Sequence, residues 1–192
     1  FRMTSPSHHV RRDEIVDFQT YDDGREATRT GVMDLKRPRR IHVGEHLTFL
    51  FENHDTIRYQ VQEMMRVEQI VREASIQQEL DTYNELLGGP GQLGCALLIE
   101  IEDEERRQTL LEAWVGLQEC LYTVTADGDR AHAGFDPAQV GRGRLSSVQY
   151  LTFTLSSPPV AIGCDFPGLE AEMALDEEQR AALATDLAAT HG

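Results

Sequence analysis

The sequence is poor in cysteine and contains no long apolar run. Its 192 residues include only 3 cysteines and no CxxC pair, so the sequence predicts neither a disulfide framework nor a thiolate zinc site. No apolar run reaches the ~20 residues that a transmembrane helix needs, and no signal peptide is recognised near the start. We therefore expect a protein of the reducing cytoplasm that does not enter a membrane.

Positive charge is also scarce. Lys and Arg number 18 against 33 Asp and Glu, which gives a formal net charge of -15. Such a charge repels the phosphates of nucleic acid and anionic membrane surfaces, so neither is an expected partner. Four basic residues form a local cluster: Lys36, Arg37, Arg39 and Arg40. We interpret this cluster as the solvated start of a strand, with a binding surface as the alternative.

Sequence signatures of catalysis are absent as well. The chain contains no GxSxG and no HExxH motif, and the glycine run 88–91 lacks the Lys-Ser/Thr of a phosphate-binding loop. Because this run follows a predicted helix, we interpret it as a helix terminator and linker. No cofactor is predicted, and the sequence leaves open whether the protein is an enzyme.

Metal binding has only weak candidates. His42, His46 and Glu52 are close together in the sequence, and in a continuous strand they would share one face. Gly44 is expected to interrupt that strand, and no helical pair of ligands accompanies the three residues. A metal site is therefore kept only as an alternative.

Two periodicities of apolar residues occur along the chain, and together they predict an α+β fold. We expect a single domain over residues 13–192, with a mainly antiparallel sheet packed against several helices, after a disordered or cloning-derived tail over residues 1–12. Strands are expected at 41–43, 47–51, 93–101, 120–125, 131–133, 146–155 and 169–175. Helices are expected at 56–72, 75–87, 103–116 and 176–190, with irregular helix at 11–33 and a short helix at 158–163.

The stretch from Arg39 to Glu68 is expected to organise the fold, because an apolar strand there leads into an amphipathic helix. At about 100° per residue, one face of this helix is a broad apolar arc formed by Ile57, Val61, Met64, Met65, Val67 and Val71. Glu68 falls near the middle of this arc. An unpaired buried carboxylate costs several kcal/mol, so Glu68 is expected to find a cation, take up a proton or line a cavity.

Besides a helix that is rotated or shorter than expected, two interpretations of Glu68 stay open. The first is a buried ion pair with Arg39 or Arg40, which the sheet would bring across. The second is a ligand pocket in which Glu68 acts as a general base or a metal ligand, with Gln60 and Tyr59 beside it. The further candidates for this pocket, on the flank and on the opposite side of the helix, are Glu63 and Arg66.

Three segments of the chain carry a resemblance to a known family: GEHLTFLFENHDTIRYQVQEMMRVE, ELDTYNELL and SSVQYLTFTL. They resemble the bacterial family catalogued as domain of unknown function 3501, and the resemblance extends over residues 18–187. The family has no established activity. Its members are encoded near genes for rubrerythrin-like and iron–sulfur oxidoreductases, which implies a role beside redox enzymes. Four of the candidate residues match the family pattern: Gln60, Glu63, Arg66 and Glu68.

One segment departs from the family pattern. Where the family carries Asp-His-Pro-x-Tyr late in the chain, this sequence has Asp165, Phe166, Pro167, Gly168 and Leu169. The histidine and the tyrosine are both missing. Any metal or acid–base role of that histidine is therefore not carried over to this chain.

These observations favour a non-catalytic cytoplasmic accessory or binding protein of bacteria, associated with redox enzymes as the resemblance implies. An enzyme or small-ligand binder with a pocket around Glu68 is the first alternative, and a metal-dependent protein is the second. A redox protein is the expected partner, and a homo-oligomer is left open.

Overall fold

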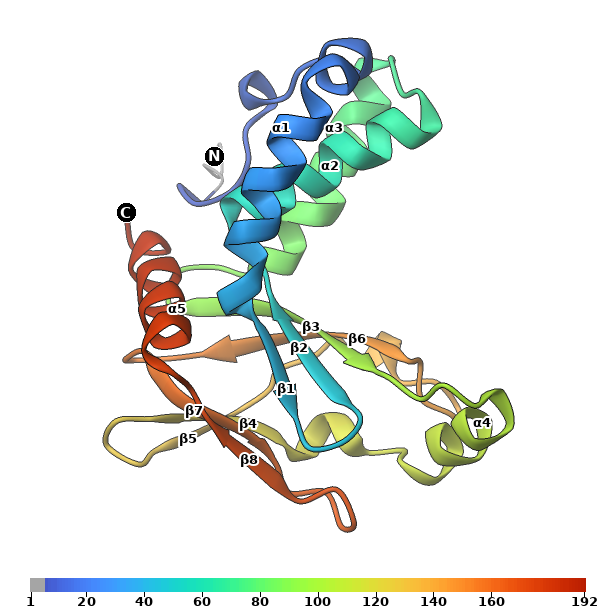
Figure 1. Ribbon diagram of the computed structural model, residues 1–192, viewed down its shortest axis with the longest axis vertical. Helices are drawn as coiled ribbons and strands as arrows, with labels where there is room; N and C mark the ends of the chain where they lie inside the picture. The colour runs from blue at the N-terminus through green and yellow to red at the C-terminus, as the bar shows by residue number, and fades with distance from the viewer. Residues whose placement is uncertain (1–5) are drawn as a thin grey trace.

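The computed structural model describes residues 6–192, and two four-stranded antiparallel sheets make up its lower half in Figure 1. The first sheet contains, in spatial order, β1 (Arg40–Val43), β2 (Leu47–Phe51), β3 (Gln92–Ile99) and β6 (Val148–Thr154). The second contains β5 (Arg130–His132), β4 (Leu121–Thr125), β7 (Pro159–Cys164) and β8 (Ala171–Ala174). An isolated bridge between Gly134 and Thr152 links the second sheet to the edge of the first.

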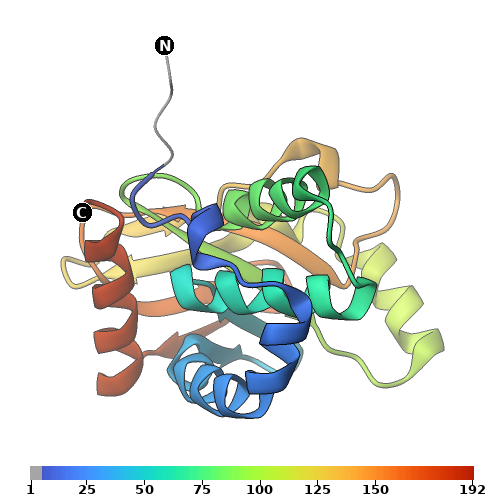
Figure 2. The same ribbon diagram turned by 90° about the horizontal axis from the view of Figure 1, so that it is seen from above.

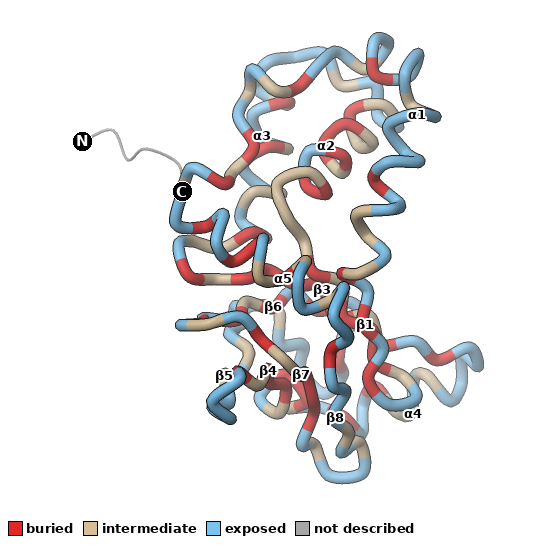
Figure 3. Tube along the Cα trace, turned by 60° about the vertical axis from the view of Figure 1, so that its left-hand side comes forward, coloured by how far each residue is buried: buried red, intermediate tan, exposed pale blue. Residues whose placement is uncertain are grey.

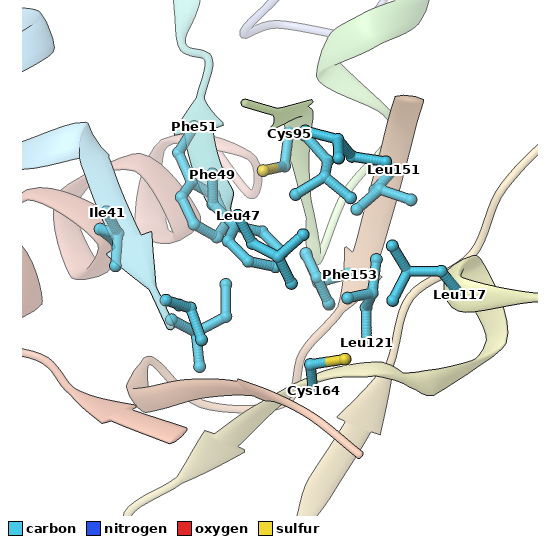
Figure 4. Packing of buried hydrophobic residues seen from close by; sticks show 14 of the residues in the cluster. Ile41, Leu47, Phe49, Phe51, Cys95, Leu117, Leu121, Leu151, Phe153 and Cys164 are labelled. Atoms are coloured by element: carbon cyan, nitrogen blue, oxygen red, sulfur yellow. The ribbon is translucent and has the colours of Figure 1, made fainter. Parts of the chain in front are cut away.

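The main hydrophobic core lies between these sheets, as Figure 4 shows. Alternate residues of a strand point to the same face, and the inward residues here are large and apolar. Phe49, Phe153, Leu121 and Ile162 are each no more than 1% exposed. Burying each such side chain contributes about 1.5–3 kcal/mol, so this core is the main source of stability.

Three helices pack together above the first sheet (Figures 1 and 2): α1 (Phe18–Lys36), α2 (His54–Glu68) and α3 (Glu73–Asn84). The side chains of Asp17 and Asn53 accept backbone hydrogen bonds at the starts of α1 and α2, which satisfies amide groups that a helix leaves free. A second, smaller apolar cluster holds the helices together and includes Val61, Met65 and Leu80. Figure 3 shows buried positions along both α2 and α3.

Two further helices flank the sheets on opposite sides in Figure 1: α4 (Glu104–Ala113) and α5 (Glu177–Ala189). Each begins at an aspartate, Asp103 or Asp176, whose side chain accepts from a backbone amide of the first turn. No helix within residues 6–192 is both long and apolar enough to cross a bilayer.

The α+β fold and its antiparallel pairing are confirmed, and two local predictions are wrong. The segment expected as a short helix at 158–163 is strand β7, paired with β4 and β8. Its first residue is Pro159, a position that a strand tolerates because no ladder donor is needed there. The irregular region at 11–33 instead contains most of one continuous helix, α1, because Gly24 and Gly31 stay helical.

The chain before α1 also differs from its prediction. Residues 1–5 of the expected loose tail lie outside the described part, whereas His8 and Val10 are buried. Val10 is 4% exposed, and its backbone exchanges two hydrogen bonds of 2.9 and 3.0 Å with the side chain of Asn84. Polar composition alone did not reveal this docking.

Candidate functional site

Glu68 is exposed, and the prediction of a buried carboxylate is wrong. Helix α2 ends at Glu68, and Gln69 takes a left-handed conformation with φ 51°. Val67 and Val71 are 69% and 71% exposed, so the C-terminal part of the expected apolar arc faces solvent. Only Val71 of the expected arc lies beyond the end of the helix, whereas Val67 lies within its last turn and is exposed as well. The buried face is carried by Ile57, Val61 and Met65, at helical spacing of four.

The two predicted arginine partners of Glu68 pair elsewhere. Arg39 donates from Nε and Nη2 to the two carboxylate oxygens of Asp186 on α5, at 2.7 and 2.9 Å. Both side chains are 8% exposed. Arg40 contacts Glu100 on the surface at 3.4 Å. A buried ion pair was therefore expected correctly for Arg39, but with the wrong carboxylate.

Tyr59, Glu63 and Arg66 do not surround Glu68. Glu63 accepts two hydrogen bonds from Arg25 of α1, at 2.8 and 2.7 Å, and one from the Tyr21 hydroxyl at 2.8 Å. The Arg25 contact, with the Tyr21 hydrogen bond, lowers the pKa of Glu63 to about 2 against the opposing effect of burial. This network ties α1 to α2, which is a structural role.

The remaining predicted residues on α2 are dispersed. Tyr59 is buried, and its hydroxyl lies 3.4 Å from a carboxylate oxygen of Glu63. Arg66 donates to Asp22 of α1 at 2.6 Å. Gln60 is half-buried. None of these contacts brings the residues to a common centre with Glu68. The predicted ligand role of these α2 residues therefore stays a prediction, and the residues do not line one common site.

The three weak metal candidates are also separated by their contacts. His42 Nδ1 lies 2.8 Å from the Thr48 hydroxyl, and His46 Nδ1 lies 3.2 Å from the Glu100 carbonyl. Gly44 has φ +65° and forms part of the turn between β1 and β2, as expected. Within the described residues, no three His, Cys, Asp or Glu side chains are arranged to hold a metal ion.

Glu52, in contrast, lines a pocket. This cavity of about 290 Å³ lies where the end of β2, the start of β3, helix α5 and the segment around His8 meet. Its apolar wall includes Leu35, Leu87 and Leu93. Ligand sites are typically mostly apolar with a few polar groups that fix orientation, and this pocket has that composition.

The Glu52 side chain has few partners of its own. One carboxylate oxygen accepts a hydrogen bond of 2.5 Å from the Thr56 hydroxyl. Within residues 6–192, no Lys, Arg or His nitrogen forms a salt bridge with it. Glu52 precedes Asn53, the N-cap of α2, so its negative charge lies beside the positive end of the helix dipole.

Two histidines border the same pocket. His8 is 9% exposed, and its Nδ1 has no hydrogen-bond partner within the described chain. Burial lowers the pKa of His8 first, and neighbouring His9 lowers it further. His54 lies between Asp55 at 3.1 Å and Glu14 at 3.0 Å, and its pKa is raised, mainly by the hydrogen bond to Asp55. The pocket is therefore bordered by one imidazole with a lowered pKa and one with a raised pKa.

Several of these residues were not predicted from the sequence. Asp186 is 147 positions from Arg39, and no local pattern connects them. His8 was assigned to the tail. Glu52 was noticed only as a weak metal candidate, although its position before a helix start and after a buried strand was a usable signal.

A larger groove of about 690 Å³ lies beside α4 but is less suited to a defined ligand. Its lining includes exposed charged residues of both signs, such as Glu45, Glu102, Asp103 and Arg106. Exposed charges are screened by water and salt, so they bind small ligands weakly. We therefore regard the smaller pocket at Glu52 as the candidate site.

Comparisons with known proteins agree with the resemblance found in the sequence. The family model described as "Protein of unknown function (DUF3501)" matches residues 9–187. A similar solved structure is the crystal structure of a novel protein of unknown function from Burkholderia pseudomallei K96243. It is 32% identical, covers 93% of this chain and 98% of its own, and has a TM-score of 0.85. No curated protein matches the chain.

Proposed function

Because the chain belongs to the DUF3501 family, whose description states no activity, we propose a function from the pocket itself: the protein binds a small molecule at Glu52. The observation that carries this proposal is that two polar side chains of the pocket lining lack partners of the expected kind. Glu52 has no cationic partner, and the buried Nδ1 of His8 has no hydrogen-bond partner, among residues 6–192.

Unpartnered polar groups are costly inside a protein. A buried donor or acceptor without a partner costs about 1–3 kcal/mol, and most such groups in folded proteins find one. At this pocket the cost applies to the buried Nδ1 of His8, whereas Glu52 accepts from Thr56 and lacks only a cation. The surrounding leucines add apolar contact, so both affinity and orientation are available in one cavity.

Pocket blocking tests the proposal. Ala189 lies in the lining of the pocket on α5 and is exposed, whereas its neighbour Ala188 is exposed outside that lining. We expect some compounds from a library of small amines, alcohols, carboxylates, sugars and nucleosides to shift the NMR amide signals of Asn53 and Gly94. Ala189→Trp should abolish these shifts, and the matched Ala188→Trp should retain them. A library without any hit at these amides contradicts the proposal.

The proposal extends the binding role expected from the sequence and leaves its finer part as a prediction. Association with a redox protein rests on the resemblance alone. The cytoplasmic location rests on the composition alone. Purification from native cells at endogenous levels tests the association, and recovery without an oxidoreductase counts against it. Whether the bound molecule is also converted is decided by incubating each hit with the protein and analysing the products.

A further inference from the structure

The positive charge of Arg39 at this pocket is already neutralised. Its guanidinium forms two hydrogen bonds with Asp186, and Nη1 donates to the Leu35 carbonyl at 2.7 Å. Asn53 contributes a further bond of 3.3 Å to Asp186. A bidentate pair of this kind fixes both charges, so Arg39 offers little net attraction for an anionic ligand.

The second cationic group is neutralised as well. His54 lies between Asp55 and Glu14, at 3.1 and 3.0 Å. When His54 is protonated, two carboxylates share its single charge. This group therefore adds no positive potential to the pocket, and an anion is disfavoured here as well.

Glu52 is the charged group of the pocket that has no partner of opposite charge within the described chain. Its Oε2 accepts from the Thr56 hydroxyl at 2.5 Å, and the start of α2 lies next to it. The Thr56 hydroxyl is neutral and the start of the helix carries only a partial positive charge, so neither contact supplies a full positive charge. Glu52 therefore adds to the pocket wall a negative charge that no cationic side chain of residues 6–192 neutralises.

The apolar part of the pocket wall restricts the chemical groups that a positively charged ligand can carry besides its charge. Leu35, Leu87, Leu93 and Ala189 line the cavity, and they favour hydrocarbon over further polar groups. The cavity volume of about 290 Å³ is roughly twice that of an engineered cavity of about 150 Å³ that admits benzene. A ligand with a hydrocarbon part the size of benzene therefore fits the cavity, with room for a short polar extension.

From this arrangement we infer that the ligand is a small organic amine, whose protonated nitrogen pairs with Glu52 while its hydrocarbon part lies against the leucines. The inference rests on the proposed binding function and names its ligand class. His8 lines the same pocket, and its Nδ1 has no hydrogen-bond partner within residues 6–192. A metal ion is not the expected cation, because the described residues offer no cluster of three ligating side chains.

Matched compounds test the charge directly. The probes are benzylamine, benzyl alcohol and benzoate, with the corresponding cyclohexylmethyl and butyl compounds. Titrations are followed through the NMR amide signals of Asn53 and Gly94. We expect each ammonium compound to bind at least about tenfold more tightly than its alcohol, with benzoate and its analogues weakest. High salt should reduce the difference.

Variants assign the effect to one carboxylate. Glu52→Gln should remove the preference for ammonium over alcohol, and Glu52→Asp should restore part of it. Glu45→Gln is the matched control: it makes the same change in net charge at an exposed residue outside the pocket lining, and it should retain the preference. Melting curves establish that each variant is folded.

The outcomes separate the inference from the proposed function. Equal or tighter binding of alcohols or carboxylates overturns the amine assignment while pocket binding stands. Loss of the preference in Glu45→Gln also overturns it, because net charge would then be the cause. If none of the compounds in the wider library shifts the pocket amides, both the inference and the proposed function fail.

Discussion

At the residue scale, Arg39 and Asp186 show why burial changes the contribution of an ion pair to the free energy of unfolding. The pair joins the end of the α1 region to α5, and both side chains are 8% exposed. Asp186→Ala leaves a buried guanidinium without its carboxylate, and we expect a loss of about 3–5 kcal/mol in the free energy of unfolding. Urea denaturation measures this loss.

An exposed pair in the same part of the chain provides the comparison. Arg37 pairs with Asp34, with side chains 65% and 68% exposed. Surface pairs contribute about 0–1 kcal/mol, so Asp34→Ala should change stability by no more than that. Equal losses in Asp34→Ala and Asp186→Ala would show that burial does not determine the value of the Arg39 pair.

Glu63 predicts an acid-dependent loss of stability. Its pKa is lowered to about 2, chiefly by the Arg25 hydrogen bond. A carboxylate with a lowered folded-state pKa stabilises the protein above its unfolded value of about 4.5, and this stabilisation is lost as pH falls toward 2. Glu63→Gln should therefore be less stable than the native protein at pH 6, and the difference should shrink below pH 4. A difference that is constant with pH contradicts the assignment.

At the element scale, the junction between the helices and the first sheet depends on Gly94 of β3. A Cβ added at Gly94 would lie 1.5 Å from the Leu86 carbonyl oxygen, so the backbone after α3 and the strand have to separate. Gly94→Ala should cost several kcal/mol through this overlap. Gly24→Ala in α1 is the control, because no atom lies within 4 Å of the new methyl group, and it should stabilise by about 0.5–1 kcal/mol. Thermal unfolding of both variants distinguishes these effects.

The elements themselves were largely predictable, because local periodicity and end signals determine them. Asp103 and Asp176 accept backbone hydrogen bonds at the starts of α4 and α5, and Gly88 ends the helical run after α3. The end of α2 was not predictable in the same way. No glycine or proline marks it, and Gln69 adopts a left-handed conformation that the sequence pattern does not favour. Glu68 is the last residue of α2 and is exposed, so the expected site does not form there.

At the scale of the whole molecule, the candidate pocket is a product of tertiary packing. It combines His8, Glu52, Gly94 and Asp186, which lie far apart along the chain. Sequence periodicity describes neighbours within one element, and it carries no information on which ends of different elements meet. Glu52 could be noticed as an unusual carboxylate, but its pocket could not be predicted without the fold.

The separation of the main core from the smaller cluster of the helices predicts a hierarchy of stability. The sheets enclose the main core, whereas α2 and α3 share a smaller cluster, and fewer buried groups give a lower opening free energy. We expect amide hydrogens of β3 and β4 to exchange only through global unfolding. Those of α2 should exchange through a partial opening about 2 kcal/mol lower in free energy.

Native-state hydrogen exchange in low concentrations of urea measures both values. Asp186→Ala should lower the opening free energy of α5 and of the residues around Arg39 more than that of β4, because the lost pair holds α5 to the chain between α1 and β1. Asp34→Ala should leave these relative values unchanged. If α2, β3 and β4 share one free energy in the native protein, the two clusters unfold as a single cooperative unit and the hierarchy is wrong.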